Sequence, residues 1–173
     1  REDGALNAYQ NTYTDILPFM EGIYHAQQTE SVATTRRIRA LIIPHHLIAS
    51  GSIASGIRAL QGQDIRNIIL LSPDHFQRCP NILCTTSASY ETFFGRVHPN
   101  TSTLTLLHVS PLVQEQEDLF KEEHGIFADM PFLRYYLPDI PVTSIVISQK
   151  LPWQQQQAAL LTLFEQLFDE QTV

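Results

Sequence analysis

The sequence predicts an α/β protein with a mostly parallel central sheet flanked by helices. Three apolar runs of strand length carry this prediction, at Ile38–Pro44, Asn67–Ser72 and Val142–Ile147. The nearly continuous hydrophobicity of the first segment is typical of strands buried on both faces of a sheet. Between the first two runs, Ser50–Leu60 has small residues and an apolar face with helical spacing. Because a strand–helix–strand unit crosses over with a right hand, its two strands are expected to be parallel neighbours.

The first 37 residues are polar and weakly patterned, and we expect them to extend a core formed by residues 38–173 of a single domain. Within this extension one short helix is predicted after Asp15, from the helical spacing of Ile16, Phe19, Met20 and Ile23. The chain starts at Arg1 rather than at a methionine and stops just after a helical pattern. We therefore expect a processed product or a piece of a longer protein, with truncation at the C-terminus.

Four further elements complete the predicted α/β pattern. Ile82–Thr86 and Tyr90–Val97 are expected to form shorter strands, the second with a glycine at position 95. Leu112–Glu122 is predicted as a helix whose acidic residues lie on a solvated face. A last helix is predicted from about Trp153 to Asp169, because its large apolar residues fall on one face.

Composition limits the function classes. Of the 173 residues, 43% are hydrophobic and 17% charged, which suffices for a sizeable core. A mean hydropathy of -0.10 and the lack of a long apolar run exclude a membrane-spanning helix. A formal net charge of -7 argues against nucleic acid bound by phosphate neutralisation. We expect a small molecule or a peptide as the partner, with neither nucleic acid nor membrane, and a cytoplasmic location unless an export signal was removed before residue 1.

The two cysteines, Cys79 and Cys84, are five positions apart, and no second pair completes a zinc site. Two free thiols are the favoured interpretation, and a disulfide between them is the alternative.

Histidines follow two of the predicted strands. The first strand runs into His45 and His46, and the second into Asp74 and His75. In open α/β sheets functional groups gather beyond the carboxyl ends of the strands, so parallel neighbours would bring these histidines to one edge. Neutral imidazole is a common ligand of zinc, copper and iron, and the spacing therefore predicts half of a metal site. The alternative is that each histidine caps its strand end by bonding to backbone.

A third candidate is His124, which follows two glutamates in a charged cluster that by itself resembles a surface turn. We expect His25, His98 and His108 to be surface or packing residues. No glycine-rich phosphate loop, no G-x-S-x-G nucleophile turn and no H-E-x-x-H motif occurs, so the function classes that need them have no support.

Four segments, in this order, resemble the Memo family, also called AmmeMemoRadiSam system protein B. Pro44–Gly51 is similar to the family's P-H-A-G segment, and Leu71–His75 is similar to its L-G-P-S-H segment. Tyr90–Val97 is similar to its Y-x-T-P-L-G-x-V segment, and Glu123–Leu133 is similar to its E-H-S-I-E-x-x-L-P-F-L segment. The resemblance implies a fold related to the class III extradiol (LigB-like) dioxygenases, which hold non-haem iron, and a divalent or redox metal: iron or copper, with zinc as the alternative. On this likeness His45 and His75 fall on two metal-binding histidines, and His124 on the pocket histidine.

The sequence departs from the family pattern at several of these positions. His46 stands in a loop that is one residue shorter, and it is our candidate for a further ligand. The family's glutamate after H-S-I is Phe127 here, and nothing matches its S-S-D-x-S-H segment or its late, usually cysteine, metal ligand. Asp74 is our candidate for an oxygen donor at this site. We predict a metal-dependent redox enzyme in which His124 and Asp74 are catalytic. The alternatives are a peptide or small-molecule binding module without turnover, which the apolar Phe127 favours, and a metallohydrolase.

Overall fold

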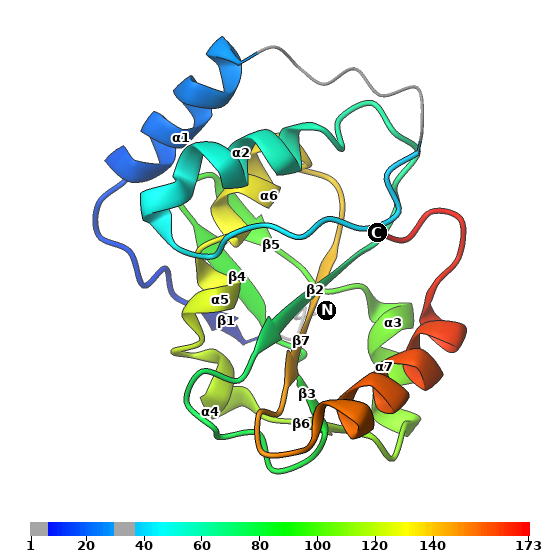
Figure 1. The fold of residues 1–173 in the computed structure, drawn as a ribbon. Helices are drawn as coiled ribbons and strands as arrows, with labels where there is room; N and C mark the ends of the chain where they lie inside the picture. The colour runs from blue at the N-terminus through cyan, green and yellow to red at the C-terminus, as the bar shows by residue number, and fades with distance from the viewer. Residues whose placement is uncertain (1–6, 30–36) are drawn as a thin grey trace, which may run out of the picture.

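A computed structural model describes residues 7–29 and 37–173 of the chain. The rest of the predicted N-terminal extension, residues 1–6 and 30–36, lies outside the described residues. Two sheets and the helices packed around them form the structure, which confirms the predicted α/β class (Figure 1). None of the described helices is both long and apolar enough to cross a membrane.

The larger sheet has four strands in the order β2-β7-β3-β6. They are β2 (Ile68–Pro73), β7 (Val142–Ile147), β3 (Leu83–Thr85) and β6 (Val113–Glu115). The β2–β7 and β3–β6 pairs are parallel, whereas β3 and β7 are antiparallel. The predicted strand at Val142–Ile147 is confirmed without a shift, and the one at Asn67–Ser72 is shifted by one residue.

A smaller sheet is formed by β1 (Ala8–Tyr9), β4 (Ser89–Thr92) and β5 (Gly95–Val97) in the order β1-β4-β5. Strand β1 pairs with β4 in parallel, and β4 and β5 form an antiparallel hairpin. The hairpin turns at Gly95, whose φ of 115° lies in a region that residues with a side chain rarely adopt. The predicted Tyr90–Val97 region therefore becomes two short strands in a sheet of their own.

Helices lie on both faces of the larger sheet, around two clusters of buried side chains. Alternate residues of a strand point to opposite faces. Accordingly, Ile68 and Val146 belong to the cluster under α1, α2 and α6, while Ile69 and Ile145 belong to the cluster under α3 and α7. The bounds of the helices are α1 (Leu17–Gln28), the 3-10 turn η1 (Leu47–Ala49), α2 (Ser50–Arg58), α3 (Thr101–Val109), α4 (Glu117–Phe120), α5 (His124–Phe127), α6 (Met130–Tyr136) and α7 (Trp153–Leu167).

Three helix predictions are confirmed by α1, α2 and α7. The helix predicted at Leu112–Glu122 is wrong, because Val113–Glu115 pairs with β3 as β6 and only the single turn of α4 follows. Helices α3 and α6 are not among the elements predicted from the sequence. Helix α3 is capped by Asn100, whose side chain accepts a hydrogen bond from the backbone N–H of Thr103 at 3.0 Å.

The strand predicted at Ile38–Pro44 is wrong. The segment is irregular and pairs with no strand among the described residues, so the predicted parallel pair with β2 does not form. Its apolar run places Ile38, Leu41 and Ile43 against the core but leaves Ile42 fully exposed. Strand β2 instead has β7 on one side, and on the other side Asn67, just before β2, forms a bridge with Thr172 near the C-terminus.

The interpretation of the cysteines as free thiols is also wrong. Cys79 and Cys84 form a disulfide, with Cα atoms 5.8 Å apart and both side chains buried. The turn after β2 folds back so that Cys79 meets the middle of β3, and such proximity cannot be read from spacing alone. The disulfide thus closes the loop that follows Asp74 and His75.

Candidate metal centre

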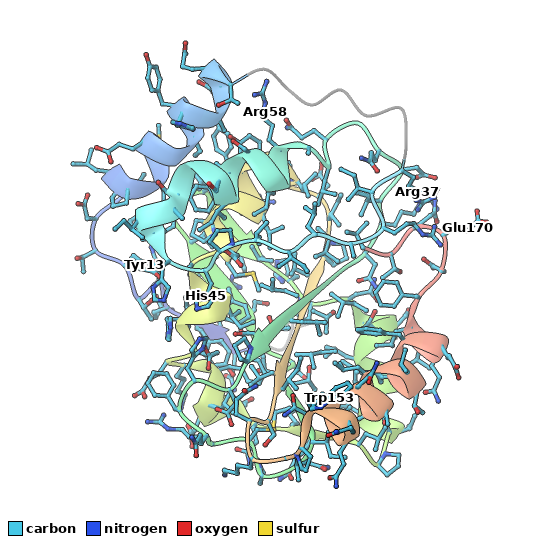
Figure 2. The ribbon with its side chains drawn as sticks, in the orientation of Figure 1. Tyr13, Arg37, His45, Arg58, Trp153 and Glu170 are labelled. Carbon is cyan, nitrogen blue, oxygen red and sulfur yellow. A yellow bond between two sulfur atoms is a disulfide. The ribbon has the colours of Figure 1, made fainter. Side chains whose placement is uncertain are left out.

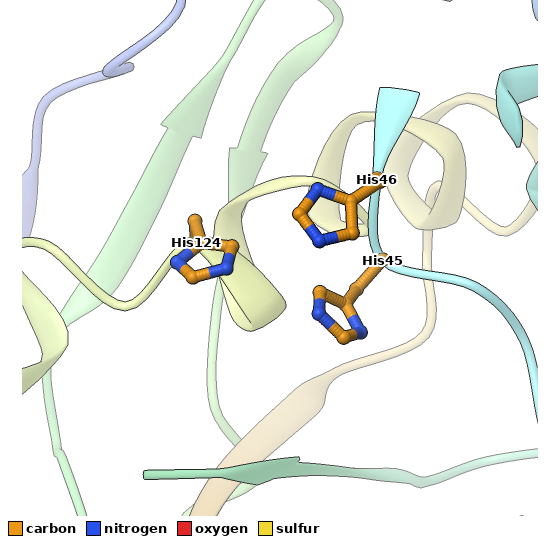
Figure 3. A group of neighbouring side chains, drawn as sticks. All are labelled: His45, His46 and His124. Carbon is orange, nitrogen blue, oxygen red and sulfur yellow. The ribbon is translucent and has the colours of Figure 1, made fainter. Parts of the chain in front are cut away.

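Four histidines come together at the carboxyl end of β2. His45 and His46 precede η1, His75 follows β2, and His124 begins α5. Figure 3 shows how His45, His46 and His124 lie near one another. Ring centroids are 4.8 Å apart for His45 and His75, and 4.1 Å apart for His75 and His124. The predicted meeting of these side chains is therefore correct, although the strand expected to deliver His45 is not formed.

Close backbone packing positions the four histidines. Helix α5 lies against the end of β2 at Gly125, where a side chain would collide with Ser72 Oγ and lie 3.0 Å from His75 Cε1. Helix α2, which continues the chain after His45 and His46, packs on α1 at Gly22, where a Cβ atom would lie 2.8 Å from Ser50. In Figure 2 His45 lies well inside the outline of the molecule, whereas Arg37 and Glu170 lie at its periphery.

Two histidines of the cluster meet through their Nε2 atoms, those of His45 and His75, which are 3.1 Å apart. On the other side of the His75 ring, Nδ1 lies 2.5 Å from Glu123 Oε1. The carboxylate of Glu123 therefore holds the ring at Nδ1, which leaves Nε2 as the nitrogen that faces His45. A carboxylate behind a histidine, fixing its tautomer in this way, is the usual support of a metal ligand.

Glu123 is the residue of the candidate site that the sequence did not single out. Its side chain is 0% exposed, and besides His75 Nδ1 it accepts hydrogen bonds from the backbone N–H groups of His75 at 3.2 Å and Gly125 at 3.1 Å. The sequence placed it in a charged surface cluster. Its neighbour Glu122 does lie at the surface, since its side chain is 60% exposed and pairs with Arg78. One feature of the sequence pointed to Glu123 as a site residue: its position beside His124 in the Memo-like segment.

Electrostatics favour the neutral imidazole at His45 and at His124. Burial lowers the pKa of His45, and the neighbouring histidines His75, His46 and His124 lower it further. Burial likewise lowers the pKa of His124, with His75 as the next cause. Because only neutral imidazole can donate a lone pair to an ion, these shifts keep the nitrogens available for binding near pH 7.

The donor set fits a transition-metal ion. Two groups have ligand atoms within 4.8 Å of one another, namely His45, His46 and His124, and His75, Glu123 and His124. Two imidazole nitrogens that bind one tetrahedral ion at about 2.0 Å lie about 3.3 Å apart, close to the 3.1 Å between His45 and His75. Nitrogen donors of this kind suit zinc, copper and iron, and Glu123 adds a buried carboxylate behind them.

The predicted catalytic residue Asp74 is not part of either group. It is 1% exposed, and its Oδ2 accepts a hydrogen bond from the backbone N–H of Cys79 at 2.7 Å. In the structure it therefore ties the disulfide loop to the end of β2. Two histidines expected to be surface or packing residues lie outside the two groups: His98 bonds Ser89 Oγ at 2.9 Å, and His108 lies 3.3 Å from Glu115.

The fold and the cluster define a class of α/β protein with a histidine-rich, carboxylate-supported site beyond the end of an edge strand. The chain belongs to the Memo family, since the sequence profile described as "Memo-like protein" matches residues 3–172. A MEMO1 family protein of Thermoplasma volcanium is 27% identical over 130 residues, covering 73% of this chain and 47% of the relative. A MEMO1 family protein of Pyrobaculum arsenaticum is 29% identical over 111 residues, covering 61% of this chain and 39% of the relative. The matched part thus spans less than half the length of each of these relatives.

Proposed function

We propose that the protein binds a redox-active metal ion, iron or copper, and uses it in a non-haem redox reaction on a small molecule. The observation that carries the proposal is the pair of Nε2 atoms 3.1 Å apart, with the His75 ring fixed from behind by buried Glu123. Membership of the Memo family supports it, because the likeness aligns His45 and His75 with metal-binding histidines.

In this proposal His45 and His75 hold the ion, and His46 and His124 are the further nitrogens within reach. An ion held there supplies open coordination positions at which a substrate is polarised or exchanges electrons. Glu123 keeps the proton of His75 on Nδ1. His124, whose side chain is 37% exposed and whose pKa is lowered, accepts a proton from a bound substrate near pH 7 and returns it later.

Metal content tests the first part of the proposal. The chain is produced without a histidine tag, dialysed against each metal in turn and measured by elemental analysis. We expect about one ion per chain, and little or none after His45→Ala with His75→Ala. The matched control is His98→Ala with His108→Ala, which also removes two histidines but leaves the cluster intact. Equal and negligible metal in all three proteins refutes the proposed function.

Turnover tests the second part. Oxygen uptake with catechol-type substrates, lost on metal removal, is the expected result for a redox enzyme. Metal-dependent hydrolysis of simple esters or amides without oxygen uptake assigns the site to a hydrolase instead. Metal binding with neither activity leaves a binding module and contradicts the redox proposal.

A further inference from the structure

We infer that the disulfide of Cys79 and Cys84 is a redox switch that sets the affinity of the histidine cluster for its metal ion. The oxidised pair holds the turn after β2 in place, and the reduced pair releases it. This inference rests on the proposed function, because the site that it regulates is the metal site of His45 and His75. It adds a means of control that the metal chemistry itself does not require.

The disulfide ties the turn after β2 to the larger sheet. Cys84 lies in β3, where it pairs with Val146 of the inner strand β7. Cys79 is bonded to it from the far end of the turn, and His75 lies in the turn between β2 and Cys79. The turn that carries His75 is therefore fastened to the sheet at both ends, by β2 and by the disulfide.

Asp74 connects the disulfide to the metal-binding histidine. Its side chain is buried, and its Oδ2 accepts a hydrogen bond from the backbone N–H of Cys79 at 2.7 Å. Its own backbone N–H is donated to the carbonyl of Ile147 in β7 at 2.9 Å. Because Asp74 immediately precedes His75, a displacement of Cys79 passes to the backbone of His75.

The turn itself has a conformation that its surroundings must maintain. Gln77 has a φ of 54°, in the left-handed region that residues other than glycine rarely adopt. Such a conformation persists only where neighbouring contacts hold it. When the disulfide is cut, one of these constraints on Gln77 is lost, so the turn is free to take another path.

The same turn contacts the other side of the cluster. Phe76 packs edge-on against His124, with ring centroids 6.0 Å apart, and Arg78 pairs with Glu122 at 2.7 Å. A movement of the turn therefore disturbs His124 as well as His75. Tight metal binding needs ligands that are already held at the right separation, so release of the turn weakens it.

A dithiol reductant operates the switch. One thiolate of the reductant attacks a sulfur of the disulfide, the S–S bond breaks, and the second thiol of the reductant displaces the mixed disulfide. The products are two cysteine thiols and the cyclic, oxidised reductant, so two electrons and two protons pass to the protein. Both cysteines are buried, but residues 76–78 and Pro80 are exposed, and local opening of the turn admits the reductant.

The test compares the two redox states of the wild-type chain. One sample is kept oxidised and the other is treated with a dithiol, which is then removed by desalting without oxygen. Free thiols are counted in both samples, and both are titrated with cobalt(II). We expect the oxidised chain to bind cobalt at least fivefold more tightly, and reoxidation to restore this affinity. The control is Cys79→Ser with Cys84→Ser, whose affinity the same treatment is expected to leave within twofold.

Substitutions of Asp74 test the route of the coupling. Asp74→Asn keeps an oxygen that accepts from the N–H of Cys79, whereas Asp74→Ala removes it. We expect the fivefold redox response to remain in Asp74→Asn and to fall below twofold in Asp74→Ala, because effects that act through one chain of contacts do not add. Asp64→Ala is the matched control, since the Asp64 side chain is 70% exposed, and it is expected to respond like wild type.

The contrary results are distinct from a failure of the proposed function. Absence of cobalt from the oxidised chain refutes the proposed function, whereas equal affinity of the two redox states overturns this inference alone. Tighter binding after reduction, with the intense near-ultraviolet absorption of a cobalt–thiolate bond, overturns it because the cysteines then act as ligands. Loss of near-ultraviolet circular dichroism on reduction also overturns it, because the disulfide then maintains the whole fold.

Discussion

The support of His75 by a buried carboxylate is tested most sharply by Glu123→Gln, which removes the charge and keeps the shape. A glutamine with its carbonyl oxygen in the position of Oε1 still accepts from His75 Nδ1 and from the backbone of Gly125. Its amide nitrogen then faces the backbone N–H of His75, where Oε2 accepted at 3.2 Å, so two donors meet. No orientation of the amide restores all three bonds.

Two effects of Glu123→Gln follow. A lost hydrogen bond to a buried charge lowers the free energy of unfolding of the metal-free chain by about 2 kcal/mol. Loss of the carboxylate behind a metal-binding histidine weakens metal affinity by roughly 10- to 100-fold, which is about 1.4 to 2.7 kcal/mol. Urea denaturation measures the first effect. Titration with zinc or cobalt against a competing chelator measures the second.

Glu122→Gln is the matched control, because it makes the same change one residue away at a side chain that is 60% exposed and pairs with Arg78. A surface pair of this kind contributes at most about 1 kcal/mol to stability, and its loss is not expected to change metal affinity. The reasoning is refuted if Glu123→Gln binds metal within twofold of wild type, or if Glu122→Gln weakens binding as much.

Three further predictions concern the surroundings of the cluster. Gly125→Ala is expected to lower the free energy of unfolding by about 1 to 3 kcal/mol and to weaken metal binding, since its Cβ would lie 3.0 Å from His75 Cε1. Replacing Cys79 and Cys84 by alanine removes a short closed loop and is expected to cost about 2 kcal/mol in urea denaturation. Burial raises the pKa of Asp129 well above its ordinary value. The folded state therefore holds this proton more tightly than the unfolded chain, so the contribution of Asp129 to stability is full at acid pH and is lost as pH rises toward the folded pKa. Asp129→Asn is expected to be more stable than wild type at pH 7.5, with a smaller difference at pH 4.5.

Each of these predictions has a contrary result. Unchanged stability and metal affinity in Gly125→Ala would mean that α5 is free to move away from β2. A midpoint in urea that a reducing agent leaves unchanged would contradict a stabilising role for the disulfide. A difference between wild type and Asp129→Asn that does not grow with pH would mean that the carboxyl is already ionised in the folded protein.

The sequence predicted the elements in which local pattern and final environment agree. Val142–Ile147 is almost entirely buried because it lies between two strands under helices on both faces, and its predicted bounds are those of β7. The Leu112–Glu122 prediction failed because the pairing of Val113–Glu115 with β3 outweighs helical spacing. Ile38–Pro44 has the local pattern of a buried strand, but backbone pairing depends on a partner far along the chain.

For the site, the sequence by itself indicated which histidines to consider: prolines stop the chain before His45 and near His75, and the Memo-like segments singled out His124. Only the tertiary structure decided how these groups combine. It selected buried Glu123 over exposed Glu122 as the support of His75, because α5 packs on β2 at Gly125 and turns one of two adjacent carboxylates inward. Contacts between residues 48 positions apart have no local signature in the chain, and packing alone creates them.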